Sequence, residues 1–337
     1  MATMRRHAAA AARDTDQASA SAVFNLAALL ASDVGLPDLA RQWCHRQADV
    51  YLRAHPLGAQ AARHALEPVI NLARLHMRAG DGERAHALME DLFTAVNDRA
   101  DTVIEGIALP AEHLTARLED QHDLRAWLWS ALLATSARAL AIAGRWNQAH
   151  DRLQALRGVG RRLFDGRQIA ILAHATSGRQ DAALALLAET APGDPWEKAV
   201  AAVLTIMCRS GATDTEADDA LKLCGRVPTA EGLDVFHTRL RLALVDALGE
   251  SDRAPEVCQD VITRACISGD GYAARDVLGH PVCSAALQPA QQQTLADAVG
   301  AAGLGRRSIP ADLHADVLAA LATAETVLLR TLDVASA

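Results

Sequence analysis

The feature that most constrains this sequence is a glycine followed five residues later by an alanine, each time after a run of apolar residues with helical spacing. Glycine ends a helix by adopting a positive φ, and a small alanine on the next helix lets two helices cross closely. Successive glycines at 144, 178 and 211 lie 34 and 33 residues apart, a period typical of stacked helical hairpins. The pairs are Gly35 and Ala40, Gly80 and Ala85, Gly144 and Ala149, Gly178 and Ala183, Gly249 and Ala254, and a longer variant, Gly211 and Ala217.

Two of these units carry a more detailed pattern, with larger apolar residues nine and twelve positions after the glycine. They are Gly144–Arg145–Trp146–Asn147–Gln148–Ala149 followed by Leu153 and Leu156, and Gly80, Ala85, Met89 and Leu92. The pattern resembles the tetratricopeptide repeat (TPR) family over roughly residues 20–270. The resemblance implies an all-α fold, a right-handed superhelical array of antiparallel helical hairpins (a TPR-like α-solenoid) whose first helices line a concave groove. It implies little about function, because such repeats bind many unrelated partners.

The composition agrees with closely packed helices in a protein of the cytoplasm. Half of the residues are hydrophobic but only 3% are aromatic, so the core has to be built largely from Ala, Leu and Val. A formal charge of −8 argues against a general binder of nucleic acid or anionic membranes. The preference for Arg over Lys is typical of a GC-rich bacterial genome. Scattered cysteines and the lack of a long apolar run favour a cytoplasmic location with reduced thiols and no membrane span.

The chain is predicted to have three parts. Residues 1–16 form a disordered or frayed lead-in, 17–270 form the helical repeat array, and 271–337 form a C-terminal helical cap. The connection 100–121 is an insertion in the array, long for an inter-helix loop and β-prone at 102–110. Helices are predicted at 17–32, 37–54, 59–79, 82–99, 122–143, 146–157, 167–177, 180–190, 195–209, 214–224, 230–248, 252–268, 285–301 and 310–334.

Two asparagines occupy equivalent places in the first two hairpins. Asn25 and Asn71 lie ten and nine residues before their turn glycines, so both fall on a first helix at nearly the same angular position. On the groove side, an asparagine can hold a peptide backbone with one donor and one acceptor. The alternative is that both residues form hydrogen bonds between helices and only stabilise adjacent repeats.

A polar face accompanies Asn71. Arg63, His64 and Glu67 share it by their spacing of three and four residues. His64 and Glu67 are at most half of a metal site, and no second ligand pair is evident, so no metal is expected. The 100–121 loop is expected to form a side wall of the groove. The expected peptide or partner contacts are Asn25, Arg63, His64, Glu67, Asn71, Arg74, Trp127 and Arg138.

The segment from Gly158 to Gln168 is the densest in Gly and Arg. Its backbone amides and guanidinium groups, those of Arg161, Arg162 and Arg167, can receive a phosphate or carboxylate. It is not a P-loop, because it lacks the Gly-Lys-Ser/Thr sequence and no strand precedes it. The alternative is a solvated turn between repeats.

No spacing of nucleophile, base or paired carboxylates points to catalysis, so we expect neither a cofactor nor an enzyme that acts alone. The sequence favours a non-catalytic scaffold or adaptor that binds a protein or peptide partner in its groove, without direct contact with nucleic acid or membrane. Two alternatives stay open. One is an accessory subunit of a ribosomal-peptide (lanthipeptide-type) modifying enzyme complex, which holds the precursor peptide or completes the synthetase. The other is a peptide-sensing regulatory protein.

Overall fold

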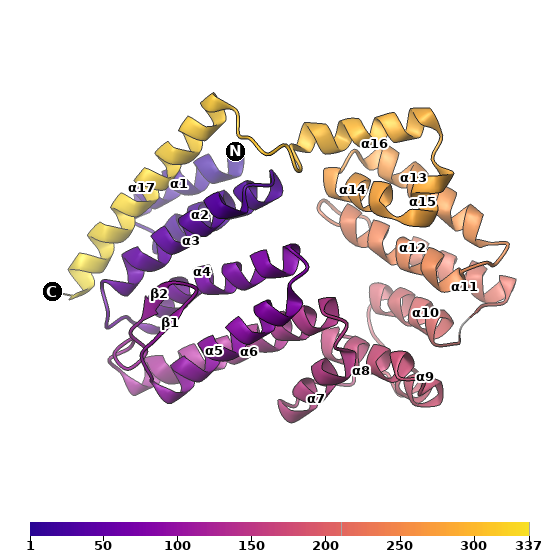
Figure 1. The fold of residues 1–337 in the computed structure, drawn as a ribbon, viewed down its shortest axis with the longest axis horizontal. Helices are drawn as coiled ribbons and strands as arrows, with labels where there is room; N and C mark the ends of the chain where they lie inside the picture. The colour runs from indigo at the N-terminus through magenta and orange to yellow at the C-terminus, as the bar shows by residue number, and fades with distance from the viewer. Residues whose placement is uncertain (210, 337) are drawn as a thin grey trace. The chain divides into compact units, whose positions relative to one another are not determined.

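A computed structural model of the chain describes residues 1–209 and 211–336. Within these residues the fold is an all-α array of seventeen helices with one two-stranded hairpin (Figure 1). The array forms two compact units, one of Met1–Arg145 with the segment from Gly305 onward, and one of Trp146–Leu304. The predicted fold class, an all-α helical array, is confirmed.

The first unit holds α1 (Ala2–Asp14), α2 (Gln17–Asp33), α3 (Pro37–Leu52), α4 (Ala59–Arg78), α5 (Gly82–Asp98), β1 (Thr102–Ile104), β2 (Ile107–Leu109), α6 (Leu118–Ile142) and α17 (Ala311–Ser336). The second holds α7 (Trp146–Ala155), α8 (Asp165–Thr176), α9 (Gln180–Ala188), α10 (Pro195–Arg209), α11 (Asp214–Gly225), α12 (Asp234–Leu248), α13 (Ala254–Ser268), α14 (Gly271–Gly279), α15 (Pro281–Ala286) and α16 (Pro289–Ala302). Each predicted helix matches one of these to within four residues at either end.

The turn glycines and the alanines five residues after them have the backbone angles and the burial that the repeat pattern predicts. Gly35 and Gly80 have φ values of 83° and 82°, which an L side chain rarely adopts. Ala40 and Ala85, five residues later, are completely buried. The remaining turn glycines also have positive φ, and their alanines Ala149, Ala183 and Ala254 are buried as well.

The N-terminal residues differ from the expected frayed lead-in, because they form helix α1, which packs against α2 and α17 (Figure 1). Met4, Ala8 and Ala11 are buried on one side of it, at the spacing of a helix face. Alanine has the highest helix propensity, so the alanine run needs only this packing contact to stay helical.

The C-terminal segment also differs from the expected single cap. Helices α14 to α16 belong to the second unit, whereas α17 packs against α1, α2 and α3 of the first (Figure 1). Val317, Leu321 and Leu328 of α17 are buried in this contact. Gln17 donates a hydrogen bond to Thr331 at 3.1 Å, and Arg46 pairs with Glu325. The apolar stripe of α17 therefore covers the N-terminal helices.

The long 100–121 connection contains the β1–β2 hairpin, in which Ile104 pairs with Ile107. Glu105 and Gly106 form its two-residue turn with positive φ at both positions. The Glu105 carboxylate contacts Arg41 at 3.2 Å and Arg84 at 2.6 Å. The hairpin packs on α3 and α5, the second helices of their hairpins, so it is not the expected side wall along the first helices.

We predict that Leu321→Ala destabilises the first unit by about 3 kcal/mol, because it leaves a cavity under α17. Leu321 is fully buried, whereas Leu329 on the same helix is 47% exposed. Leu329→Ala should change the free energy of unfolding by about 0.5 kcal/mol or less. Urea unfolding followed by circular dichroism measures both. Equal effects of the two substitutions would contradict the docking of α17.

Candidate functional site

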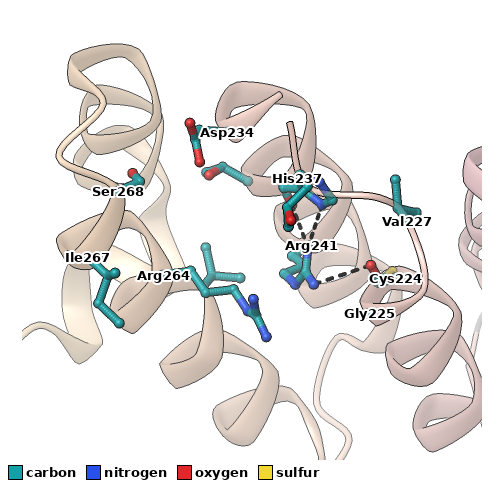
Figure 2. A pocket seen from close by; sticks show the side chains of 12 residues that line it. Cys224, Gly225, Val227, Asp234, His237, Arg241, Arg264, Ile267 and Ser268 are labelled. Carbon is teal, nitrogen blue, oxygen red and sulfur yellow. Dashed lines mark hydrogen bonds between the residues drawn. The ribbon is translucent and has the colours of Figure 1, made fainter. Parts of the chain in front are cut away.

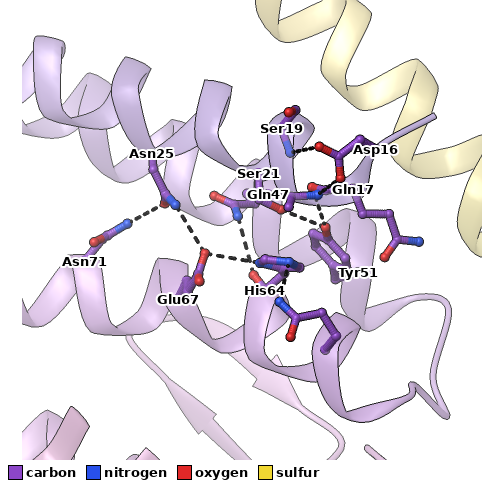
Figure 3. Close-up of polar contacts among 12 residues, drawn as sticks. Asp16, Gln17, Ser19, Ser21, Asn25, Gln47, Tyr51, His64, Glu67 and Asn71 are labelled. Carbon is purple, nitrogen blue, oxygen red and sulfur yellow. Dashed lines mark hydrogen bonds and ion pairs between the residues drawn. The ribbon is translucent and has the colours of Figure 1, made fainter. Parts of the chain in front are cut away.

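A row of polar side chains crosses from α2 to α4 in the first unit (Figure 3). The Nδ2 of Asn71 donates to the Oδ1 of Asn25 at 2.8 Å, and the Nδ2 of Asn25 donates to the Oε2 of Glu67 at 3.2 Å. The two asparagines that the repeat pattern places at equivalent positions therefore meet across neighbouring first helices. The two asparagines therefore form a hydrogen bond between helices, as the alternative to a purely peptide-binding role predicts.

The row continues at both ends. At one end Arg74 donates to the Oδ1 of Asn71 at 3.0 Å. At the other, the Nδ1 of His64 lies 3.4 Å from the Oε2 of Glu67, and the Nε2 of His64 lies 3.0 Å from the Nε2 of Gln60. Because His64 is buried, its ring nitrogens need partners within the protein, and Glu67 and Gln60 supply them. His64 and Glu67 thus serve a hydrogen-bonded network.

The charges in the row depend on one another. Burial raises the pKa of Glu67, but the hydrogen bond and charge of His64, the amide of Asn25 and the charge of Arg74 outweigh it, so the pKa lies below its ordinary value. Burial also lowers the pKa of the Arg74 guanidinium, and the positive charge of Arg138 on α6 lowers it further. Glu67 is thus held ionised, and Arg74 and Arg138 lie close enough to repel each other.

The Arg74 end of the row opens on a pocket of about 240 Å³ between α2 and α4. Polar side chains of Asn25, Asn71 and Arg74 line one part of it, and Leu26, Leu29 and Leu75 line another. Leu29 is 42% exposed, so the apolar part is open to a ligand. We call this set of six residues and its pocket the Asn25–Arg74 surface.

The other predicted contacts do not line this pocket. Arg63 donates to the carbonyl oxygen of Asp123 at 3.4 Å, and its Nε is buried without a partner among the described residues. Trp127 is half-buried on α6, and Trp129 is 36% exposed. Arg138 is exposed on the same helix. Of the predicted set, the structure brings Asn25, Asn71 and Arg74 to the pocket and places His64 and Glu67 behind it.

Two of the three arginines predicted to receive an anion are bonded within the chain. Arg162 pairs with Asp194 at 3.0 Å and holds the buried carboxylate of Glu197 with several hydrogen bonds. The buried Arg167 donates to Thr190 at 2.8 Å and to the carbonyl oxygens of Gly160 and Leu186. Arg161 is exposed beside them. The segment is therefore a turn that Arg162 and Arg167 brace from within the chain.

An apolar groove of about 470 Å³ in the second unit was not predicted. It lies along α8, α10 and α12, the first helices of three successive hairpins, and Met207 within it is 38% exposed. Phe236 of the groove packs against Trp196, and Trp196 packs against Phe164, with ring centroids 6.4 and 6.2 Å apart. Helical spacing alone assigns such residues to the core, so the sequence held no signal that they are open. The apolar lining residues are Leu172, Val200, Val203, Leu204, Met207, Val235, Phe236, Leu240 and Ala243.

Comparisons with models of known protein families, with curated proteins and with solved structures find no match for this chain. Among the described residues, no helix is long and apolar enough to cross a membrane. The same residues contain no group of three or more His, Cys, Asp or Glu side chains placed to hold a metal ion. Five of the six cysteines are buried, and all six are free thiols. The two surfaces described above are therefore the candidate binding sites of this chain.

We predict that Arg162→Gln lowers the free energy of unfolding at neutral pH, because Glu197 loses its main charged partner. The hydrogen bond from Arg162 holds the pKa of Glu197 at about 2, below its ordinary 4.5. This stabilisation is present above the ordinary pKa and is lost as the pH falls toward 2. The difference in the free energy of unfolding between wild type and variant should therefore shrink as the pH falls from 4.5 to about 2.

The neighbouring Arg161→Gln serves as the control and should change stability little at any pH, since Arg161 is exposed. Chemical unfolding at a series of pH values measures both variants. A gap between wild type and Arg162→Gln that stays constant down to pH 2 would contradict the bracing role.

Proposed function

We propose that the protein is a non-catalytic scaffold or adaptor that binds a peptide or a peptide segment of a protein partner on the Asn25–Arg74 surface. The observation that carries the proposal is the pairing of Asn71 with Asn25 at 2.8 Å beside a pocket that polar and apolar side chains line together. A side chain that only linked two repeats would not need an open pocket next to it.

The hydrogen-bond capacity of the two amides fits a peptide group. An asparagine offers two N–H donors and two acceptor lone pairs. Asn25 uses one donor toward Glu67 and one acceptor toward Asn71, and Asn71 uses one donor toward Asn25 and one acceptor toward Arg74. Each amide thus retains one donor and one acceptor, which is the pair that a peptide backbone presents. The network fixes both amides before any ligand arrives, so that little side-chain entropy is lost on binding.

The repeat architecture supports the same function. The turn glycines and buried alanines resemble those of the TPR family, in which first helices line a concave groove that binds other proteins. The apolar groove on α8, α10 and α12 is a second surface on first helices, suited to larger apolar side chains. A cytoplasmic peptide-binding protein of this kind can serve as the accessory subunit of a lanthipeptide-type modifying complex, or as a peptide-sensing regulator.

We predict that Asn71→Ala weakens peptide binding about tenfold, the equivalent of one or two lost hydrogen bonds. The ligand is obtained by selecting a random peptide library on the purified full chain, and its Kd is measured by fluorescence polarisation. Asn97→Ala is the matched control, because Asn97 is an asparagine on α5 outside this pocket that bonds its neighbour Asp98.

The comparison is valid if both variants keep the helical circular dichroism of the wild type. Selected peptides that bind wild type and Asn71→Ala equally would refute the Asn25–Arg74 surface as their site. Failure of repeated selections to yield any saturable binder would refute the scaffold proposal itself. The selected sequence separates the two finer roles, since a leader-like segment favours the modifying complex and a short signal-like peptide favours the regulator.

A further inference from the structure

A second polar pocket, of about 240 Å³, lies in the second unit between the end of α11, α12 and α13 (Figure 2). Its wall includes Arg241, which is only 2% exposed. Arginine is rarely buried to this extent unless its charge and donors are satisfied. How Arg241 is held therefore indicates what the pocket can bind.

Arg241 is fixed on three sides by its own chain. Its Nε donates to Asp260 at 3.1 Å. Its Nη1 donates to the carbonyl oxygen of His237 at 3.2 Å, and its Nη2 donates to the carbonyl oxygen of Cys224 at 3.3 Å (Figure 2). A guanidinium has five N–H groups. Even with the longer 3.4 Å contact between Nη1 and the His237 ring, one N–H of Nη2 has no acceptor among the described residues.

Arg264 brings a second guanidinium to the same wall. Its Nε donates to both carboxylate oxygens of Asp260, at 2.9 and 2.8 Å, and its side chain is 53% exposed. Its two terminal nitrogens have no acceptor within the described part of the chain. Asp260 thus orients both arginines, and its single negative charge is shared between the two positive guanidinium groups. The pKa of Arg241 lies below its ordinary range because of burial and, next, the charge of Arg264.

The remaining wall limits the ligand in size and charge. Val227, Val261 and Ile267 supply an apolar side, and Ile267 is 80% exposed although it is a large aliphatic residue. Asp234 supplies an exposed carboxylate that repels a second negative charge on the ligand. The volume is below that of a pocket for a drug-sized molecule. A single negative charge next to a short apolar group satisfies all of these features.

We propose that this pocket binds a carboxylate that carries a short apolar group, with the terminal nitrogens of Arg264 and the Nη2 of Arg241 as donors. The same chemistry is found in a free short-chain acid and in the C-terminal residue of a peptide that ends in an aliphatic side chain. The site is separate from the Asn25–Arg74 surface and does not depend on the function proposed there.

Isothermal titration of the full chain with hexanoate tests the proposal, with inorganic phosphate and hexylamine as comparison probes. Hexanoate should bind one saturable site, and hexylamine should not bind there because its ammonium cannot accept hydrogen bonds from the two guanidinium groups. Arg264→Gln should weaken hexanoate binding about tenfold or more, the effect of losing a charge-assisted pair. Arg275→Gln on α14 is the matched control and should leave it unchanged, since Arg275 is a partly exposed arginine that pairs with Asp276.

Two further measurements separate the sources and the role of Asp234. An N-acetylated tetrapeptide that ends in leucine with a free carboxylate should bind more tightly than hexanoate if the ligand is a chain end, and should not bind if it is a free acid. The amide form of the peptide should fail in either case. Asp234→Asn should improve phosphate binding without loss of hexanoate. Absence of saturable hexanoate binding, tighter binding of phosphate by the wild type, or an unchanged affinity in Arg264→Gln would overturn the proposal.

Discussion

The close crossing of helices at small side chains is the constraint on which the rest of the structure depends. Ala40 and Ala85 are completely buried where the second helix of each hairpin meets its neighbours. At Gly82 the helices are so close that even an alanine does not fit, because a Cβ at this position would lie 2.1 Å from the carbonyl oxygen of Ala139 on α6. Only 3% of the residues are aromatic, so the chain cannot fill wide gaps between helices and has to keep them close.

Close packing also explains the polar row. Asn25 and Asn71 sit at equivalent places in successive repeats, and the short distance between α2 and α4 lets their amides bond directly. Polar groups that lie half-buried between helices are costly unless they find partners. Each member of the row therefore bonds the next, which holds Glu67 ionised and fixes the amides that face the pocket. Stabilising the repeat and preparing a binding surface are two results of the same contacts.

Local signals in the sequence were enough for fourteen of the helices, the turns and the Asn25–Asn71 pair, but they did not predict α1, α14 or α15. In a stack of repeats, residues at equivalent positions of successive hairpins lie next to each other in space. The placement of α17 could not be predicted, because its partners on α1 to α3 are about 300 residues away in the sequence. The same holds for Arg162 and Arg167, whose acceptors Glu197 and Thr190 lie 35 and 23 residues further on. The 100–121 hairpin was recognised as β-prone, but its packing on α3 and α5 is again a long-range contact.

The arginines show why density of charge in a sequence is a poor guide to a binding site. Arg162 lies in the segment richest in Gly and Arg, yet its donors are directed at Glu197 and Asp194, and nothing in that geometry calls for an external anion. Arg264 stands in no such cluster, but it shares Asp260 with Arg241, and one carboxylate cannot neutralise two guanidinium groups. What separates the two cases is the balance between donors and acceptors, which is set by residues on other helices. A site for an anion is therefore to be found where the fold leaves that balance incomplete.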